Sequence, residues 1–184
     1  ISYRLVGSEM CIRDRSSHGA TIGIITSIIL YKVKYKYDSV LWIFDRLVIA
    51  VALGGTLVRI GNFFNSEIVG VFTNSDYGVI FQNRGEILPR HPAQLYEAFG
   101  YIILFITLVL IYNKTKLKDF KGFLFGFFLM FLFVVRFIVE YVKESQGGLE
   151  EQLGIFSTGQ WLSIPFILIG IGLMIYSYIS IEKK

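Results

Sequence analysis

The sequence predicts an all-α membrane protein, a polytopic helix bundle, on three observations. Hydrophobic residues make up 54% of the 184 residues and charged residues only 17%, whereas a water-soluble domain normally carries about a quarter charged residues. The mean hydropathy is +0.59. Apolar stretches approach or exceed the roughly 20 residues that a helix needs to cross a bilayer, and short polar or basic segments separate them.

Five of these apolar stretches are candidate membrane spans. The first begins near His18 and ends at Tyr31, and it can be extended through Val33 and Tyr35. The others are residues 40–63, 93–112, 122–141 and 158–181.

The first fifteen residues differ in character from the rest. Residues 1–15 have no helical or strand periodicity, and the composition changes abruptly at Ser16. The segment resembles translated adapter sequence, so we expect it to be non-native; the alternative is an ordinary polar tail. The transmembrane domain is then residues 16–184. The single Cys11 excludes an internal disulfide.

Lysines predict the orientation of the spans. They cluster between spans one and two, between spans three and four, and at the C-terminus: Lys32, Lys34, Lys36; Lys114, Lys116, Lys118, Lys121; Lys183, Lys184. These three segments share one side if every span crosses, and the positive-inside rule makes that side cytoplasmic. Basic loops also account for the net charge of +4 without a nucleic-acid partner.

Unusual polar residues all fall at the opposite, outer ends of the spans. They are His18, Arg59, Asn62, residues 91–97, Arg136, Glu140 and residues 157–160. Polar residues are unfavourable near a bilayer and are usually retained for function. The pattern therefore predicts a site at the outer face of the membrane.

Two arginines in this set indicate an anion. Arg136 and Glu140 are four residues apart and share a helix face. An ion pair that fastens helices would explain Arg136 alone. Arg59 at the same depth, with Glu67, Glu97 and Glu140 nearby, favours a pocket, and two guanidiniums can bind a lipid phosphate bidentately.

The remaining polar residues leave alternatives open. His18 is a candidate base, since nearby arginines favour neutral imidazole, or a hydrogen-bonded interfacial histidine. Gln94 and Glu97 face the same side of a helix that starts at His91-Pro92, whereas Tyr96 points to a different side. These residues either belong to the site or form a polar cap for the third span. The sequence contains no metal-ligand spacing, no glycine-rich nucleotide loop and no serine nucleophile elbow.

Five motifs in order resemble the prolipoprotein diacylglyceryl transferase family. They are Ser17-His18-Gly19, Arg59-Ile-Gly-Asn62 continuing to Gly70, Arg90-His-Pro-Ala-Gln-Leu-Tyr-Glu97, Arg136-Phe-Ile-Val-Glu140 and Gly159-Gln-Trp-Leu-Ser-Ile-Pro165. The resemblance runs from Ser16 to the C-terminus. Lys143-Glu144 and the sequence from Gln160 to Pro165 are similar to the Bacteroidetes branch of the family. Ala20 stands where the family usually has glycine. The family has seven spans and a cytoplasmic C-terminus, which implies an N-terminally truncated chain that contains the last five.

The resemblance implies an enzyme of the bacterial inner membrane with its active site toward the periplasm. It would transfer diacylglyceryl from phosphatidylglycerol to the lipobox cysteine thiol of a preprolipoprotein signal peptide. A thioether would form and glycerol 1-phosphate would leave, as the first step of lipoprotein maturation.

The resemblance also implies roles for individual residues. His18 would be the base, Arg59 and Arg136 would hold the phosphate, and Glu140 would orient Arg136. The implied substrate-binding residues are Asn62, Gly70, Glu67, Tyr96 and Glu97. No metal or organic cofactor is implied, because the lipid carries its own leaving group.

Two other classes of protein stay open. A small transporter or channel would also gather charges in a polar cavity, but with polar residues at mid-span or on both sides. A non-catalytic lipid-binding or assembly subunit would need the arginines but no base.

Overall fold

The computed structural model describes residues 22–24, 26–35, 39–144 and 157–182. The chain divides into two compact units, residues 1–43 and residues 44–184. In the first unit, residues 22–24 and 26–35 are helical, with mostly exposed side chains. The first expected span therefore lies partly outside the described residues, and His18 lies wholly outside them.

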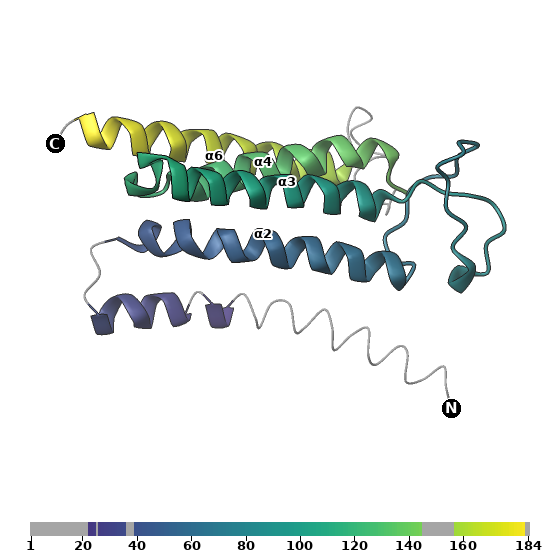
Figure 1. The fold of residues 1–184 in the computed structure, drawn as a ribbon, viewed down its shortest axis with the longest axis horizontal. Helices are drawn as coiled ribbons and strands as arrows, with labels where there is room; N and C mark the ends of the chain where they lie inside the picture. Colours follow the sequence, from purple (N-terminus) through teal and green to yellow (C-terminus); the bar gives the residue numbers. More distant parts are fainter. Residues whose placement is uncertain (1–21, 25, 36–38, 145–156, 183–184) are drawn as a thin grey trace. The chain divides into compact units, whose positions relative to one another are not determined.

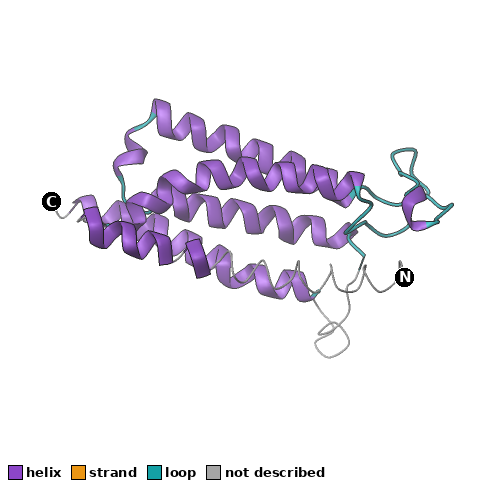
Figure 2. Ribbon diagram, turned by 90° about the horizontal axis from the view of Figure 1, so that it is seen from below, coloured by secondary structure: helices purple, strands orange, loops and turns teal. Residues whose placement is uncertain are grey.

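From residue 40 onward, the described residues contain four long helices: α2 (Val40–Phe64), α3 (Ala93–Lys114), α4 (Phe123–Val139) and α6 (Thr158–Glu182). Each is long and apolar enough to cross a membrane, α4 together with the short helix η3 (Glu140–Val142) that continues it. Helices suit this setting because they satisfy their backbone hydrogen bonds internally. Over the described ranges no strand occurs, and Figure 2 shows only helices and loops.

The all-α membrane fold is thus confirmed, with the last four expected spans in place. The expected ends at 63, 112, 141 and 181 compare with observed ends at 64, 114, 142 and 182. Turn residues and charges at the boundaries, such as the lysine-rich segment after α3, made these ends readable from the sequence.

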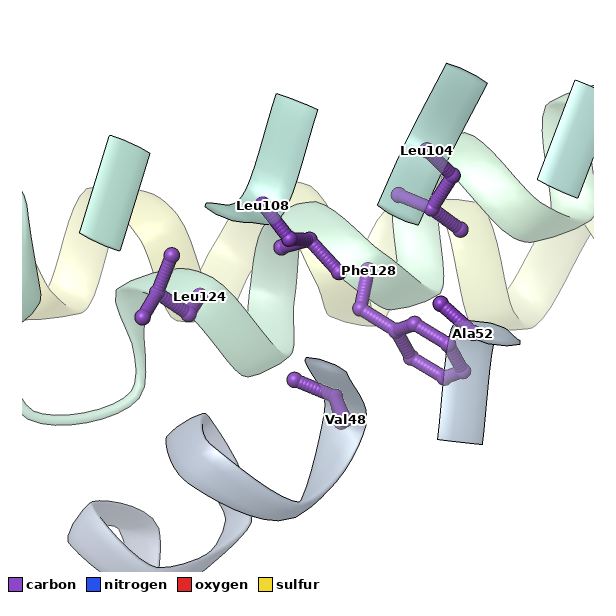
Figure 3. Packing of buried hydrophobic residues seen from close by; sticks show 6 residues of the cluster. All are labelled: Val48, Ala52, Leu104, Leu108, Leu124 and Phe128. Atoms are coloured by element: carbon purple, nitrogen blue, oxygen red, sulfur yellow. The ribbon is translucent and has the colours of Figure 1, made fainter. Parts of the chain in front are cut away.

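Helices α2, α3 and α4 meet in one apolar cluster, shown in Figure 3. Its members are Val48, Ala52, Leu104, Leu108, Leu124 and Phe128. Each helix contributes two side chains four residues apart, which is the spacing that places both on one helix face. Because all three helices contribute, the cluster holds α2 and α3 against α4.

Helices α4 and α6 approach each other through two glycines. A Cβ atom at Gly126 would lie 2.7 Å from the Gly170 carbonyl oxygen, and one at Gly170 would lie 2.6 Å from the Gly126 carbonyl oxygen. Small residues allow membrane helices to pack this closely. The rings of Phe133 and Phe166 stack farther along the same pair, with centroids 4.4 Å apart. This contact positions the first turn of α6 beside the last turn of α4.

The four helices have their ends in two regions, and each region is named for the segment that connects helices there. The loop end carries residues 65–92, which connect α2 to α3 at the right of Figure 1. The lysine end carries residues 115–122, which connect α3 to α4.

At the lysine end, Asp45 of α2 caps the start of α4. Its carboxylate accepts hydrogen bonds from the backbone N–H of Gly122 at 2.6 Å and of Phe125 at 2.8 Å. Asp45 is 1% exposed. A carboxylate is favourable there because the first amides of a helix have no partner within the helix. A structural role therefore explains why this membrane-spanning helix carries a charge near its start.

Removing this cap should destabilise the protein. We expect Asp45→Ala to lower the thermal unfolding midpoint of the detergent-solubilised chain by about 2–8 °C, from a capping loss of about 1–2 kcal/mol. Asp45→Asn keeps one acceptor oxygen, so its shift should be smaller. Intrinsic fluorescence on heating measures both. An Asp45→Ala midpoint equal to that of the parent chain would contradict the capping role.

Candidate functional site

The loop end brings together charged side chains from helices α2, α3 and α4. The Arg59 Nε atom lies 2.7 Å from the Glu97 Oε2 atom, and their side chains are 14% and 2% exposed. Arg59 lies in the last turns of α2 and Glu97 in the second turn of α3. A buried ion pair of this kind is sensitive to loss of either partner, because the remaining charge is left uncompensated. The structure thus joins two residues that were predicted to share one pocket.

Lys143 extends this pair into a larger cluster. Its Nζ atom lies 3.6 Å from Glu140 Oε2 and 3.9 Å from Glu97 Oε1, with only 8% of the side chain exposed. We call Arg59, Glu97, Glu140 and Lys143 the charged cluster. Sequence reasoning did not assign Lys143 to the site, although it follows Glu140 by three residues and thus lies near it at the helix end.

Glu140 is arranged differently from the expectation that it pairs with Arg136. In the described part of the chain, its ion pair is with Lys143 and none joins it to Arg136. The Glu140 carboxylate also lies against the backbone of Gly159, where any added Cβ atom would collide with it. Gly159 belongs to the first turn of α6, and a helix N-terminus favours negative charge. Glu140 therefore ties α4 to α6.

Arg136 approaches the charged cluster through a tyrosine. Tyr101 is 4% exposed and interacts electrostatically with Glu97, Arg59 and Arg136. The Arg136 guanidinium carbon also lies 5.9 Å from the centroid of the Phe133 ring. Arg59 hydrogen-bonds to the Tyr101 side chain, and Arg136 lies near enough to interact with it electrostatically. Tyr101 was not singled out from the sequence, although it follows Glu97 by four residues and shares its helix face.

A strained turn follows Arg59 and Asn62. Ser66 and Ile68 both have φ of +57°, a left-handed conformation that is uncommon for a β-branched residue. Asn62 is 6% exposed, and its carbonyl oxygen accepts a hydrogen bond from the Glu67 N–H at 2.9 Å. Strained backbone of this kind is concentrated at functional sites. The turn presents the Glu67 carbonyl oxygen to Gln94 Nε2, which donates to it at 2.6 Å.

Gly70 lies where three backbone segments cross. Its N–H donates to the His91 carbonyl oxygen at 2.9 Å, and the next residue, Val71, donates to the Val142 carbonyl oxygen at 2.9 Å. A Cβ atom at Gly70 would lie 2.6 Å from both of these carbonyl oxygens. Only glycine fits here. Gly70 thereby locks the loop between the start of α3 and the end of α4.

Arg90 organises the rest of the loop. Its guanidinium contacts Glu86 Oε2 at 2.6 Å, the Gly70 carbonyl oxygen at 3.0 Å and Glu144 Oε1 at 3.1 Å. It also lies 3.7 Å above the Phe72 ring. This residue was quoted within a motif but given no role, and only the fold reveals that its partners lie up to 54 residues away. Arg90 connects the loop to the end of α4.

The loop should loosen in acid. The pKa of Glu86 is lowered, chiefly by its hydrogen bonds with Arg90, from an ordinary value of 4.5. A lowered folded-state pKa stabilises the fold above the ordinary value, and that stability is lost as the pH falls below 4.5. Val79 and Arg90 exchange two backbone hydrogen bonds, at 2.9 and 3.0 Å, and we expect the protection of these amides from hydrogen exchange, relative to the intrinsic rate at each pH, to fall below this pH. Glu86→Gln should remove the acid dependence; an unchanged dependence in this variant would exclude Glu86 as its origin.

Tyr96 and Gln160 serve the two helix starts nearby. The Tyr96 hydroxyl lies 3.3 Å from His91 Nδ1, away from the charged cluster, as its displaced position on the helix predicted. Gln160 Oε1 accepts from the Ser157 N–H at 3.0 Å, while Ser157 Oγ accepts from the Gln160 N–H at 3.3 Å. This reciprocal pair is a capping box. It fixes the start of α6 beside Glu140.

The predicted site residues thus divide into three groups. Arg59, Glu97, Glu140 and, through Tyr101, Arg136 lie together at the loop end. Glu67, Gly70 and Asn62 build the turn and crossing beside them. Tyr96 contacts His91 instead. His18 lies outside the described residues.

Fold and site define a helical membrane protein with a buried, charged site at one end of its spans. Residues 15–176 match the prolipoprotein diacylglyceryl transferase family model, and the chain belongs to this family. It is 47% identical over 162 residues to a phosphatidylglycerol–prolipoprotein diacylglyceryl transferase of Tolumonas auensis, covering 88% of this chain and 62% of that protein.

Similar proteins of the same name occur in other bacteria. The one from Bacteroides fragilis is 41% identical over 163 residues, which are 88% of this chain and 57% of that protein. The one from Chloroherpeton thalassium is 40% identical over 162 residues, which are 88% and 60% of the two chains. The chain therefore spans about three fifths of the length of the curated relatives it matches.

Proposed function

We propose that the chain carries the phosphate-binding part of a phosphatidylglycerol–prolipoprotein diacylglyceryl transferase. The observation that carries this proposal is the buried Arg59–Glu97 ion pair at one end of the helices, with Arg136 near enough to interact electrostatically with Tyr101, which Arg59 hydrogen-bonds. Relatives at 40–47% identity have names that state both the lipid donor and the protein acceptor. Two guanidiniums at one end of a membrane helix bundle suit a phosphodiester, which each can bind through two hydrogen bonds.

The reaction needs a sulfur nucleophile and a phosphate leaving group. The thiol of the lipobox cysteine loses its proton to a base, and the sulfur attacks the lipid glycerol carbon that bears the phosphate ester. The carbon–oxygen bond breaks, its electron pair leaves with the phosphate oxygen, and glycerol 1-phosphate departs. No cofactor takes part. Arg59 and Arg136 stabilise the charge that develops on the leaving group, in a site already organised by Glu97 and Lys143.

His18 is proposed as the base. A free thiol has a pKa of about 8.5, so a neutral imidazole nearby increases the fraction of thiolate. We expect His18→Gln to lower the turnover number while leaving lipid binding unchanged. Single-turnover kinetics together with a lipid-binding titration separate these quantities. Parent-like turnover in the variant would exclude His18 as the base.

The proposed orientation follows the lysines. The lysine end would face the cytoplasm together with the C-terminus, and the loop end would face the periplasm of a bacterial inner membrane. Lipid would then reach Arg59 from the outer leaflet. The signal peptide of the acceptor, anchored in the same membrane, would present its cysteine at that depth.

Complementation tests the function in cells. In a hybrid transferase, the 162 aligned residues of the Tolumonas auensis relative are replaced by those of this chain. It is expressed in bacteria depleted of their own transferase, and lipoprotein processing is followed by gel mobility. We expect modified prolipoprotein with the hybrid and none with its Arg136→Ala variant. Good membrane expression without modification would contradict the transferase and favour a non-catalytic lipid-binding role.

A further inference from the structure

Two buried oxygen atoms, one within the charged cluster and one next to it on α3, have no hydrogen-bond donor among the described residues. They are Gln94 Oε1 and Glu97 Oε1. Gln94 is 0% exposed and Glu97 is 1% exposed. A buried acceptor without a donor destabilises a folded protein, so such atoms call for a partner that the chain itself does not supply.

Both oxygens are held in place by the other half of their own side chain. Gln94 Nε2 donates to the Glu67 carbonyl oxygen at 2.6 Å, so the amide cannot flip without setting two oxygens against each other. Glu97 Oε2 is held by Arg59 at 2.7 Å. The two residues are three apart on α3 and share a face. The free oxygens are therefore fixed neighbours, one helical turn apart.

The surrounding charges select a neutral donor over a cation. Glu97 already has Arg59 at 2.7 Å and Lys143 at 3.9 Å. A third cation would be repelled by both, whereas a hydroxyl group donates a hydrogen bond without adding charge. Two acceptors one turn apart, next to a guanidinium, suit a diol attached to a phosphate.

We propose that Gln94 Oε1 and Glu97 Oε1 accept hydrogen bonds from the two hydroxyl groups of a glycerophosphoryl head group and so select phosphatidylglycerol. This inference rests on the proposed function, whose lipid donor it explains. Phosphatidylethanolamine would be rejected because its ammonium group meets Arg59 and Lys143. Gln94 thereby acts as a specificity-determining residue, and Glu97 has a second role besides its ion pair.

Short-chain lipids that differ only in hydroxyl number test this directly. The full chain in detergent is titrated with dihexanoyl phosphatidylglycerol, the phosphatidyl-1,3-propanediol analogue with one hydroxyl, and phosphatidylpropanol with none. Native mass spectrometry measures the bound fraction. We expect affinity to fall in steps, by about threefold per hydroxyl and about tenfold in total. Equal affinity for the three lipids, or no binding of the first, would overturn the proposal.

A matched variant tests the Gln94 side chain. Gln94→Met keeps the length of the side chain but removes the Oε1 acceptor together with the Nε2 donor to the Glu67 carbonyl oxygen, so the comparison between lipids with and without hydroxyl groups isolates the part of the effect that belongs to the acceptor. We expect it to lose about threefold in affinity for phosphatidylglycerol and to keep the affinity of the parent chain for phosphatidylpropanol. A loss of affinity for both lipids alike would indicate a purely structural role and contradict the proposal. The stepwise result on the parent chain holds even if this variant fails to fold.

Two further comparisons distinguish this inference from binding of the released product and from the proposed reaction. Free glycerol 1-phosphate should bind more weakly than the lipid because it lacks acyl chains, and equal binding would assign the two oxygens to the released product instead. If the hybrid transferase is inactive but the stepwise preference persists, only the reaction assignment is lost. If the hybrid is active but Gln94→Met leaves head-group preference unchanged, only the present inference is lost.

Discussion

Arg136→Lys in the hybrid transferase is expected to reduce turnover by about a hundredfold or more, the usual effect of losing an oriented donor to a developing anion. A lysine keeps the positive charge, but it offers one ammonium where arginine offers a planar fork that binds two phosphate oxygens. Arg59→Lys should act similarly and also weaken the pair with Glu97, which is only 2% exposed. Initial rates with phosphatidylglycerol vesicles and a cysteine-containing acceptor peptide measure these effects.

The matched control is Arg84→Lys. Arg84 lies in the loop between α2 and α3. It pairs with Glu86 and Glu144, which are not members of the charged cluster. Its rate should stay within about twofold of the parent, as expected for an exposed ion pair of small energetic weight. If Arg84→Lys lowers the rate as much as Arg136→Lys does, the loss would reflect a general sensitivity to replacing arginine by lysine and would contradict a specific phosphate-binding role for Arg136.

Gly70→Ala is the second change with a large expected effect. The new Cβ atom would lie 2.6 Å from the carbonyl oxygens of His91 and Val142. Both are backbone atoms, so the loop must move away from α3 and α4, at a cost of about 1–3 kcal/mol. We expect a lower unfolding midpoint together with at least a tenfold loss of turnover, because the displaced loop carries the Glu67 carbonyl oxygen away from Gln94.

Gly61→Ala provides the comparison for this prediction. Gly61 lies in α2 two residues after Arg59, and an added Cβ atom would meet nothing within 4 Å. Alanine also favours the helix. Its stability and rate should match or exceed those of the parent. Equal behaviour of the two alanine variants would show that Gly70 is not needed for the backbone crossing.

These residues show what the sequence could and could not predict. The spans were predictable because apolar length and lysine-rich connections are local signals, and four of them match the structure closely. The location of Arg59, Glu97 and Glu140 at one end of the bundle was predictable because each successive span crosses the membrane in the opposite direction. These predictions needed only the order of elements along the chain.

The partners of individual side chains were not predictable in the same way. Helical spacing suggested Glu140 for Arg136, but Lys143 and the backbone of Gly159 occupy the Glu140 carboxylate. Asp45 accepts a hydrogen bond from Gly122, 77 residues later, and Arg90 reaches Glu144 across 54 residues. Contacts between residues so far apart in the sequence depend on how the helices pack against one another. The spacing of residues within one helix gives no information on this packing.

Mass analysis of the acceptor peptide in a purified reaction tests the central claim most directly. The hybrid transferase is reconstituted in phosphatidylglycerol vesicles with a lipobox peptide, and a cysteine-to-serine peptide serves as control. We predict that the cysteine peptide gains the mass of one diacylglyceryl group, that glycerol 1-phosphate is released in equal amount, and that Arg136→Ala abolishes both. An unmodified cysteine peptide, under conditions in which the Tolumonas auensis relative modifies it, would contradict the account.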